Sequence, residues 1–390
     1  MNTLKSPSES LELGQWFKLI CGASYQDVSK IRNLSLVYCL AGADCIDVAA
    51  DIAAVYAASE GIAIARSLLK KRHGSPYGRP WLMVSLNDGQ DPHFRKAWFD
   101  HQRCPVDCDR PCERVCPADA ILPIKPGPIG SVLERTTGLE VLAERCYGCG
   151  RCLPVCPHQL IEERSFTVGA GATIPALLHH IDAIEIHTQV GRQAAFEKLW
   201  KQLSPYISQL QLVAVSCPDS QSDSGNVIDY LTQIYQLMNP RPNQLVWQTD
   251  GRPMSGDIGK GTTLATIRLA QKVLSARLPG YVQLAGGTNS YTVEKVRSLN
   301  LLKEAYRFGK PNQIAPQTIS GIAYGSYARQ LVSIGDGPLE AHPRQLWQQV
   351  SLAYELVSQI KPNLRSEHGV LPFLKNDNES TQTSVTTLPP

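Results

Sequence analysis

The sequence has 390 residues, of which 43% are hydrophobic and 19% charged, as is ordinary for a soluble globular protein. A net charge of +3, with no basic stripe among aromatic residues, does not favour nucleic-acid binding. We see no run of about 18 apolar residues, so we expect no membrane span. The opening residues 1–14 are polar and lack the apolar core of a signal peptide, so we expect a cytoplasmic protein with reduced cysteines.

Short apolar segments alternate with helix-length segments along the chain. Eight of them are apolar and mostly run into Gly, Asp or Asn, which is typical of buried strands. These predicted strands are residues 16–22, 45–50, 81–87, 183–188, 210–216, 244–249, 281–285 and 319–324. The helix-length segments include residues 54–71, 192–207, 227–237, 261–276 and 293–306. Apolar strands each followed by a helix predict a parallel sheet, and eight favour a (β/α)8 barrel; a doubly wound open sheet is the alternative.

Residues 101–165 interrupt this alternation with two cysteine runs, each of which ends in Cys-Pro. The second run has the bacterial ferredoxin spacing C-x2-C-x2-C-x3-C-P, and the first has three residues in every gap. The eight cysteines are Cys104, Cys108, Cys112, Cys116, Cys146, Cys149, Cys152 and Cys156. Two such runs predict two iron–sulfur clusters, and therefore a protein that accepts, passes or senses electrons.

The spacing also predicts which cysteines act together. A cubane cluster offers one iron to each of four thiolates, and Gly148 and Gly150 allow one tight loop to wrap around it. In two-cluster ferredoxins the fourth cysteine of each run binds the other cluster. We therefore predict two [4Fe–4S] clusters with crossed ligand sets. One set is Cys146, Cys149, Cys152 and Cys116, and the other is Cys104, Cys108, Cys112 and Cys156.

Disulfides and zinc are the competing interpretations of eight clustered cysteines. The polar N-terminal stretch argues against disulfides, and zinc does not explain two runs that end in Cys-Pro. Pro105 and Pro111 argue against a continuous helix through the first run. At this point it stays open whether Cys104 is a ligand and whether the first-run cluster is complete.

We expect residues 14–100 and 166–366 to form the barrel, with residues 101–165 inserted as a two-cluster, bacterial-type ferredoxin domain. If the third barrel helix resumes at residues 174–181, the insertion grows from the barrel end where active sites lie. A helix at residues 92–99 would instead place it at the opposite end. Residues 1–13 and 367–390 are polar, and we expect them to be disordered tails.

Glycine-rich segments follow the last two predicted strands. Loops at these places in barrels often bind a phosphate, which makes them candidates to hold flavin mononucleotide or a phosphorylated substrate; tight turns explain the glycines equally well. The candidate contacts are Gly286, Gly287, Asn289, Gly325 and Ser326. Residues 250–261 form another charged, glycine-rich loop that is suited to a ligand or a docking partner.

Other polar side chains fall at or just beyond predicted strand ends, where barrel active sites lie, although each alone is more often a capping or packing residue. They are Asp51, Asp88, His187 and Cys217. Three cysteines in or beside apolar strands are predicted to be buried core thiols. They are Cys21, Cys39 and Cys45.

Residues 16–24 (WFKLICGAS), 41–51 (AGADCIDVAAD) and 284–289 (LAGGTN), with the paired cysteine runs, resemble the cyanobacterial light-dependent period protein family over nearly the whole chain. The family consists of iron–sulfur proteins of the circadian input pathway. The resemblance implies a redox sensor: photosynthetic electron flow sets the state of the clusters or of the quinone pool, and the protein reports light to the clock. It also implies clock input kinases and oscillator proteins as partners, with a quinone or another compound as electron donor.

A second hypothesis comes from the barrel itself, because barrels overwhelmingly serve as enzymes. It is a ferredoxin-coupled oxidoreductase, in which the clusters pass electrons to a flavin or a phosphorylated substrate at the barrel mouth. The sequence names no substrate, so we favour the signalling protein.

Overall fold

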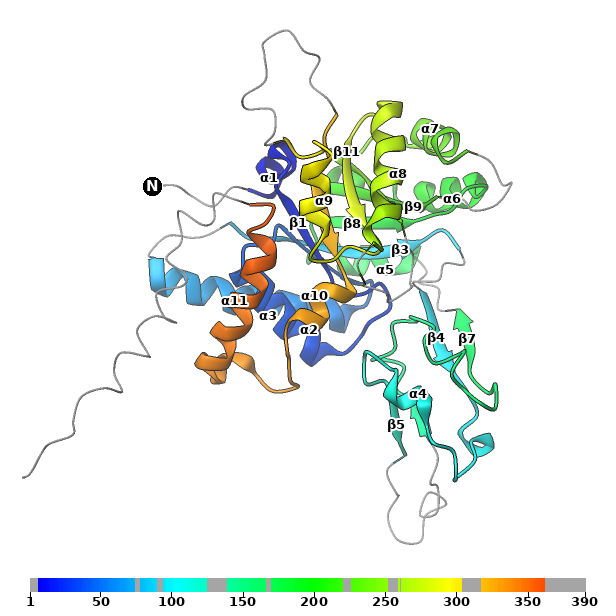
Figure 1. The fold of residues 1–390 in the computed structure, drawn as a ribbon. Coiled ribbons are helices and arrows are strands. Elements are labelled where there is room, and N and C mark those ends of the chain that lie inside the picture. Colours follow the sequence, from blue (N-terminus) through cyan, green and yellow to red (C-terminus); the bar gives the residue numbers. More distant parts are fainter. Residues whose placement is uncertain are drawn as a thin grey trace, which may run out of the picture.

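The computed structural model describes residues 6–73, 78–89, 94–124, 139–165, 170–219, 226–251, 259, 261–303 and 317–361. Its centre is a closed barrel of parallel strands in the order β1-β12-β11-β10-β9-β8-β3-β2 (Figure 1). The strands are β1 (Trp16–Ile20), β2 (Cys45–Ala49), β3 (Trp81–Asn87), β8 (Ala183–His187), β9 (Leu212–Pro218), β10 (Leu245–Asp250), β11 (Tyr281–Ala285) and β12 (Gly321–Tyr324). All eight predicted strands are confirmed. The open sheet is wrong, because β1 pairs with both β2 and β12 and so closes the barrel.

Helices lie outside the barrel and bury their apolar sides against the outward-facing strand residues. Consecutive helices α5 to α8 pack against one another, and α2 packs against both α3 and α11. The helices are α2 (Val28–Leu40), α3 (Ile52–His73), α5 (Ala170–Leu177), α6 (Gln193–Leu203), α7 (Val227–Leu237), α8 (Thr263–Ala276), α9 (Thr292–Ser298), α10 (Ser326–Leu331) and α11 (Pro343–Val357). Each of the five predicted helix-length segments overlaps one of them.

The helix α3 is long and apolar enough to meet the length and composition of a membrane-spanning helix. In this fold its small apolar side chains, such as Ala54, Ala58 and Ile62, are buried in the main core. The composition of α3 is therefore also that of a core helix of a barrel.

The amino ends of the barrel strands are covered by α1 (Pro7–Leu13), within a segment that we expected to be disordered. The prediction is wrong for these residues, because a capping box fixes the start of the helix. Ser6 Oγ accepts a hydrogen bond from the Glu9 N–H, and the Glu9 carboxylate accepts one from the Ser6 N–H. Leu11 is buried with Trp16 at this end of the barrel. The predicted C-terminal tail, residues 367–390, lies outside the described residues.

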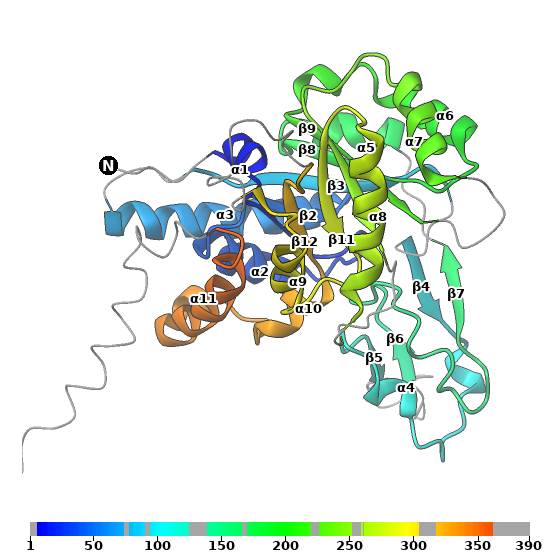
Figure 2. The same cartoon turned by 45° about the horizontal axis from the view of Figure 1, so that its top comes forward.

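The insertion leaves the barrel after β3 and returns to it through α5, so it grows from the carboxyl ends of the strands. Residues 95–98 form strand β4 (Arg95–Trp98), so the helix considered over residues 92–99 is wrong there. This strand pairs antiparallel with β7 (Glu162–Ser165), the last strand of the insertion, and Figure 2 shows the two side by side. The guanidinium of Arg164 lies 3.1 Å from the centre of the Trp98 ring and holds the pair together.

Between these two strands the insertion contains a second small sheet, in which β5 (Ile121–Pro123) pairs antiparallel with β6 (Leu139–Val141). A short helix, α4 (Pro111–Arg114), precedes it. Phe99, Ile121 and Leu139 form an apolar cluster of their own with Cys112 and Cys152. The insertion therefore has its own small core, in which cysteines take the place of larger apolar side chains.

Candidate metal centre

The cysteines of the insertion lie mainly in loops between its short strands. In the first run Cys112 lies in α4, and the run as a whole lies between η2 (His101–Arg103) and β5. The second run follows β6 in a segment without helix or strand. Gly148 and Gly150 have φ angles of 71° and 70°, the left-handed conformation that favours glycine. The loop thus curls as the ferredoxin spacing predicts.

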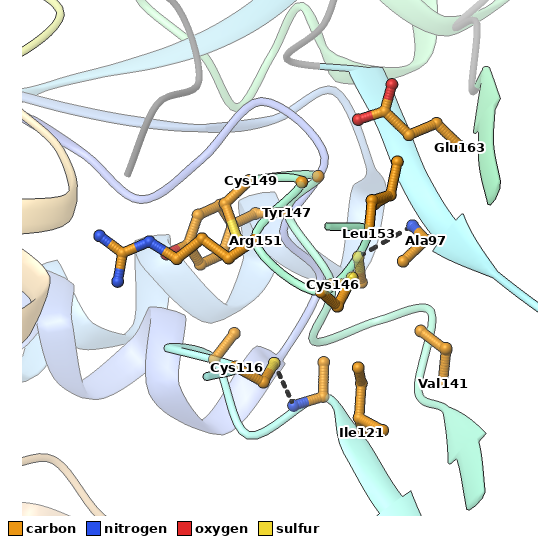
Figure 3. Close-up of a pocket in the computed structure, with 15 residues that line it drawn as sticks. Ala97, Cys116, Ile121, Val141, Cys146, Tyr147, Cys149, Arg151, Leu153 and Glu163 are labelled. Carbon is orange, nitrogen blue, oxygen red and sulfur yellow. Dashed lines mark hydrogen bonds between the residues drawn. The ribbon is translucent and has the colours of Figure 1, made fainter. Parts of the chain in front are cut away.

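Cys116, Cys146, Cys149 and Cys152, one of the two predicted ligand sets, line a single pocket (Figure 3). Most of the other wall residues are apolar. They include Ala97, Ala118, Ala120, Ile121, Val141 and Leu153. One pocket therefore draws on both runs, because Cys116 comes from the first. Four soft thiolates in an apolar setting are a donor set that fits an iron–sulfur cluster.

The other four cysteines are close enough to influence one another's ionisation. Burial raises the pKa of Cys104, and the nearby Cys108 and Cys156 raise it further. Burial also raises the pKa of Cys112, and the nearby Cys156 and Cys104 raise it further. Cys104, in doubt from its sequence position alone, thus lies beside the other members of its predicted set.

Burial has a cost for cysteines that bind metal as thiolates. It raises the pKa of Cys152 to about 12, and the neighbouring Cys149 and Cys146 contribute. Iron bound here would compensate the thiolate charge, so binding would release protons. Within the described residues, no group of three or more His, Cys, Asp and Glu side chains is close enough to hold a single metal ion. A cubane accepts more widely spaced thiolates, because each binds its own iron.

Backbone amides donate hydrogen bonds to cysteine sulfurs in both predicted sets. The pairs are Ala97 N–H to Cys146 Sγ at 3.3 Å, Ala120 N–H to Cys116 Sγ at 3.2 Å, and Leu160 N–H to Cys156 Sγ at 3.5 Å. Figure 3 shows the first two as dashed lines. Such bonds stabilise electron-rich sulfur and help to set the potential of a cluster bound to it.

Tyr147 holds the second run against the barrel. Its ring meets that of Tyr25 edge-on, with centroids 6.4 Å apart, and the Arg329 guanidinium lies 4.5 Å from its centre. Burial raises the pKa of Tyr147, and its hydrogen bonds with Arg329 and Ser326 partly offset this rise. Arg329 also donates to the Ile20 carbonyl oxygen at the end of β1, at 2.9 Å. A residue between two cysteines therefore connects the insertion to the barrel mouth.

Polar contacts next to Tyr147 strengthen this connection. Lys96 of β4 donates through Nζ to Gln26 Oε1 at 2.8 Å and to the Ala143 carbonyl oxygen at 2.6 Å. Arg145 lies 3.3 Å from the Asp27 carboxylate. Gln26 and Asp27 belong to the loop after β1, so this loop of the barrel is a place where the insertion is attached by polar contacts.

The loop after β11 is closed by its own hydrogen bonds. The Asn289 side chain is buried; its amide donates to the Gly259 carbonyl oxygen at 2.9 Å and to Thr262 Oγ1 at 3.0 Å. Its side-chain oxygen accepts from the Tyr291 N–H at 2.9 Å. Gly287 has a φ of 85°, and a Cβ there would lie 2.7 Å from the Thr262 carbonyl oxygen. These contacts match the tight-turn interpretation of the segment that includes Gly286.

The other predicted phosphate contacts lie elsewhere. Ser326 is the first residue of α10, directly after Gly325, and its Oγ accepts from Arg329 at 3.2 Å. In the part of the chain that the structure describes, no hydrogen bond joins Ser326 to Asn289 or Gly287. The structure therefore brings Ser326 to Tyr147 of the insertion, and Asn289 to the start of α8.

Most of the remaining candidates have structural contacts. Asp51 Oδ1 accepts from the N–H groups of Ala53 and Ala54 at the start of α3, and Asp88 lies 3.4 Å from Arg192. A separate set of cysteines is buried, as predicted. It comprises Cys21, Cys39 and Cys45, and Cys217, a candidate for the barrel mouth, is buried too. Most of the loop 250–261, namely residues 252–258 and 260, lies outside the described residues.

Sequence analysis missed a charged cluster inside the barrel. The Lys18 ammonium is fully buried, contacts Glu185, and lies 3.0 Å from both Asp47 and Gln248. His187 Nε2 lies 3.0 Å from Glu185. Burial raises the pKa of Asp47 to about 6, whereas Lys18 and His187 outweigh burial and keep the pKa of Glu185 below its usual range. The signal was available, since each charge stands alone inside an apolar strand.

Fold and cysteines together define a class, a (β/α)8-barrel protein with a cysteine-rich insertion suited to iron and sulfur at the barrel's active-site end. Residues 104–167 match the LdpA Fe-S cluster-binding domain, and residues 177–359 match the light dependent period A C-terminal domain. A curated protein named light dependent period A, from Synechococcus elongatus (strain ATCC 33912 / PCC 7942 / FACHB-805), is 49% identical over 366 residues, which are 91% of this chain and 94% of that protein. The chain therefore belongs to the light dependent period A family and carries its iron–sulfur-binding domain.

Proposed function

We propose that this protein is an iron–sulfur redox sensor that relays the state of photosynthetic electron transport, and hence light, to the circadian clock. Family membership supports the circadian role, since the relative is named for light and period. The match of residues 104–167 to an iron–sulfur-binding domain supports the cofactor. The observation that carries the proposal is the pocket lined by cysteines of both runs at the barrel mouth.

The proposed cofactors are two [4Fe–4S] clusters, held by a ferredoxin-type domain over residues 101–165. We assign one cluster to the set lining the pocket and the other to the set that contains Cys104. When bound, each cluster would supply one-electron redox chemistry close to the protein surface. The backbone N–H groups directed at Cys116, Cys146 and Cys156 would stabilise the reduced, more negative state.

A sensor also needs a surface that responds to the redox state. The contacts of Tyr147 and Arg145 with Arg329 and Asp27 supply such a link, because they lie next to Cys146 and are partly electrostatic. Negative charge gained in the pocket would strengthen the attraction for nearby guanidinium groups and hold the insertion more firmly against the barrel. The proposed readers of that change are clock input kinases and oscillator proteins, and the proposed electron source is a quinone or another electron carrier.

The direct test is to measure binding of the chain to these clock proteins at controlled potentials under anaerobic conditions. Affinity should change across the midpoint potential of the clusters, because a change of state acts only through differential binding. The Cys149→Ser variant should lose this dependence. Equal affinity for oxidised and reduced protein would refute the sensor.

The alternative is a ferredoxin-coupled oxidoreductase with a flavin or phosphorylated substrate at the barrel mouth. One observation favours it: Lys18, Asp47, Glu185 and His187 form a buried charged cluster, which a passive scaffold does not require. Releasing the small molecules from anaerobically purified protein, and recording their absorbance and mass, tests this function. A flavin or phosphorylated compound at one equivalent would support the enzyme, and none would leave the sensor.

A further inference from the structure

Asn87, the last residue of β3, has a buried side chain without a partner. Only 5% of its surface is exposed. Neither its side-chain nitrogen nor its side-chain oxygen has a hydrogen-bond partner among the described residues. Leaving a buried donor or acceptor unpaired destabilises the folded state, because the group has lost its hydrogen bonds with water. A residue that served only the scaffold would not retain this cost, which points to a group that Asn87 is there to meet.

The side chain of Asn87 faces the inside of the barrel. Alternate strand residues face the same side, and Ser85, two positions earlier, donates to the inward-facing Asp47 at 2.9 Å. His187 is the direct neighbour of Asn87 on β8, and it has the same orientation as the inward-facing Glu185. Asn87 and His187 therefore form a polar pair at the carboxyl ends of adjacent strands, where barrel active sites lie.

Two other strands contribute small side chains near the mouth. Ala49 lies two residues after the inward-facing Asp47 on β2, opposite Ser85 of the neighbouring strand β3. Ala285 lies two residues after the inward-facing Gln283 on β11, opposite Asp250 of β10. Because each contributes only a methyl group, they leave space beside the polar pair for a flat ligand.

Charge and hydrogen-bond pattern restrict the ligand. The layer below contains Asp47 and Glu185 against a single cation, Lys18, and Asp250 is buried at the end of β10. This excess of carboxylates disfavours an anion inside the barrel. A carboxamide offers one donor face and one acceptor, so its best partner is a ring edge with adjacent C=O and N–H groups.

We propose that the barrel mouth binds the cyclic amide edge of a planar heterocycle through Asn87, beside His187. Isoalloxazine and uracil share this edge. The position favours isoalloxazine, because the site is connected to the cysteine pocket through Phe94. The ring centroids of Phe94 and His187 are 5.4 Å apart, and Phe94 directly precedes β4. Three residues after Phe94, the Ala97 N–H donates to Cys146 Sγ. Three extended residues span about 10 Å, so the proposed ring lies near the cysteine pocket. A flavin bound there would be a partner for electron exchange with a cluster held in that pocket.

The test is titration of the purified full chain with riboflavin and, separately, with uridine, followed by fluorescence or calorimetry. Both probes are neutral and carry the amide edge. Saturable binding of riboflavin supports a flavin site, and binding of uridine alone supports the amide edge but moves the ligand to the pyrimidines. Binding of neither at millimolar concentration overturns the proposal. The clusters are not involved in this test, so its failure leaves the redox sensor standing.

Variants of Asn87 distinguish a binding role from a structural one. Asn87→Leu should weaken binding at least tenfold, since about 1.4 kcal/mol corresponds to tenfold. The same change should raise the melting temperature, because it removes an unpaired buried amide. Unchanged ligand affinity in Asn87→Leu would mean that the Asn87 amide is hydrogen-bonded only to ordered water, and would overturn the proposal.

Asn33 is the matched control. It is also buried, but its side-chain nitrogen donates to the carbonyl oxygens of Gly335 and Gly337, at 3.1 and 2.8 Å. Asn33→Leu should therefore lower the melting temperature and leave the probe affinity unchanged. If Asn87→Leu fails to fold, Asn87→Asp keeps the shape but removes the donor, and it should weaken binding of the ring carbonyl by about the same factor.

Discussion

The guanidinium of Arg329, on the barrel helix α10, lies 4.5 Å from the centre of the Tyr147 ring, between the cysteines of the second run. Arg329 also binds the carbonyl oxygen of Ile20, at the end of β1. One side chain thus touches both the cysteine loop and the rim of the barrel. Any displacement of the loop has to move Arg329 or break one of these contacts.

Arg329→Gln should loosen the loop around Tyr147 while the barrel stays folded. The loss of the cation–π contact costs about 1 kcal/mol. We expect faster amide hydrogen exchange in residues 144–150. Arg241→Gln is the control, because Arg241 lies 3.8 Å from the centre of the Tyr235 ring, a cation–π pair outside the insertion. Equal exchange rates in wild type and Arg329→Gln would contradict the coupling.

Anaerobic analysis of the intact protein should give about eight iron and eight acid-labile sulfide per chain, as two cubanes require. Cys149→Ser and Cys108→Ser should each lose about half of this content, because we assign the two cysteines to different clusters. Cys217→Ser, a change at a buried barrel cysteine, should keep all of it. A wild-type value of about four, or zinc in place of iron, would contradict the two-cluster assignment.

Lys18→Met should destabilise the barrel by about 3–5 kcal/mol near neutral pH, because it removes the cation that Asp47 and Glu185 share in a fully buried site. The ammonium keeps the pKa of Glu185 below its ordinary value. Its stabilising effect is therefore fully present above that ordinary value, and it is lost as the pH falls through the lowered pKa of the folded state. The difference between wild type and variant in urea unfolding should shrink toward low pH. A difference that is constant with pH would show that lost packing alone is responsible.

Asn289→Ala should cost about 1–3 kcal/mol, since it removes the side chain that donates to the Gly259 carbonyl oxygen and to Thr262 Oγ1 and that accepts from the Tyr291 N–H. Urea unfolding measures this loss. A stable Asn289→Ala variant with weakened binding of flavin mononucleotide would instead restore Asn289 as a phosphate contact.

The sequence contained enough to predict the barrel, because its strands are apolar runs with regular spacing, and β3 and β11 begin and end at the predicted residues. The spacing of the cysteines also predicted that Cys116 of the first run would lie with the second run, and these cysteines do line one pocket, whereas their binding of iron stays a prediction. By contrast, α1 was missed because its seven residues look polar, and its stability depends on the capping by Ser6 and on the burial of Leu11.

Long-range contacts account for most of the remaining differences. Tyr147 reads as a generic residue between two cysteines, and only the fold brings Arg329 to it. Asn289 was suited by its position to bind a phosphate, but Thr262 and Gly259, far away in the sequence, engage its amide. Lys18, Asp47 and Glu185 form a cluster only because β1, β2 and β8 close into a barrel.

The antiparallel pairing of β4 and β7 bears on how the protein folds and takes up its cofactor. With Arg95 opposite Ser165, the chain re-enters the barrel beside the point at which it leaves. Inserting the domain therefore adds little to the entropy cost of closing the barrel, because the ends of the loop already meet. We therefore expect the barrel to fold before the proposed clusters are assembled. Oxidative loss of iron would then leave a scaffold ready for reloading rather than a chain to be degraded.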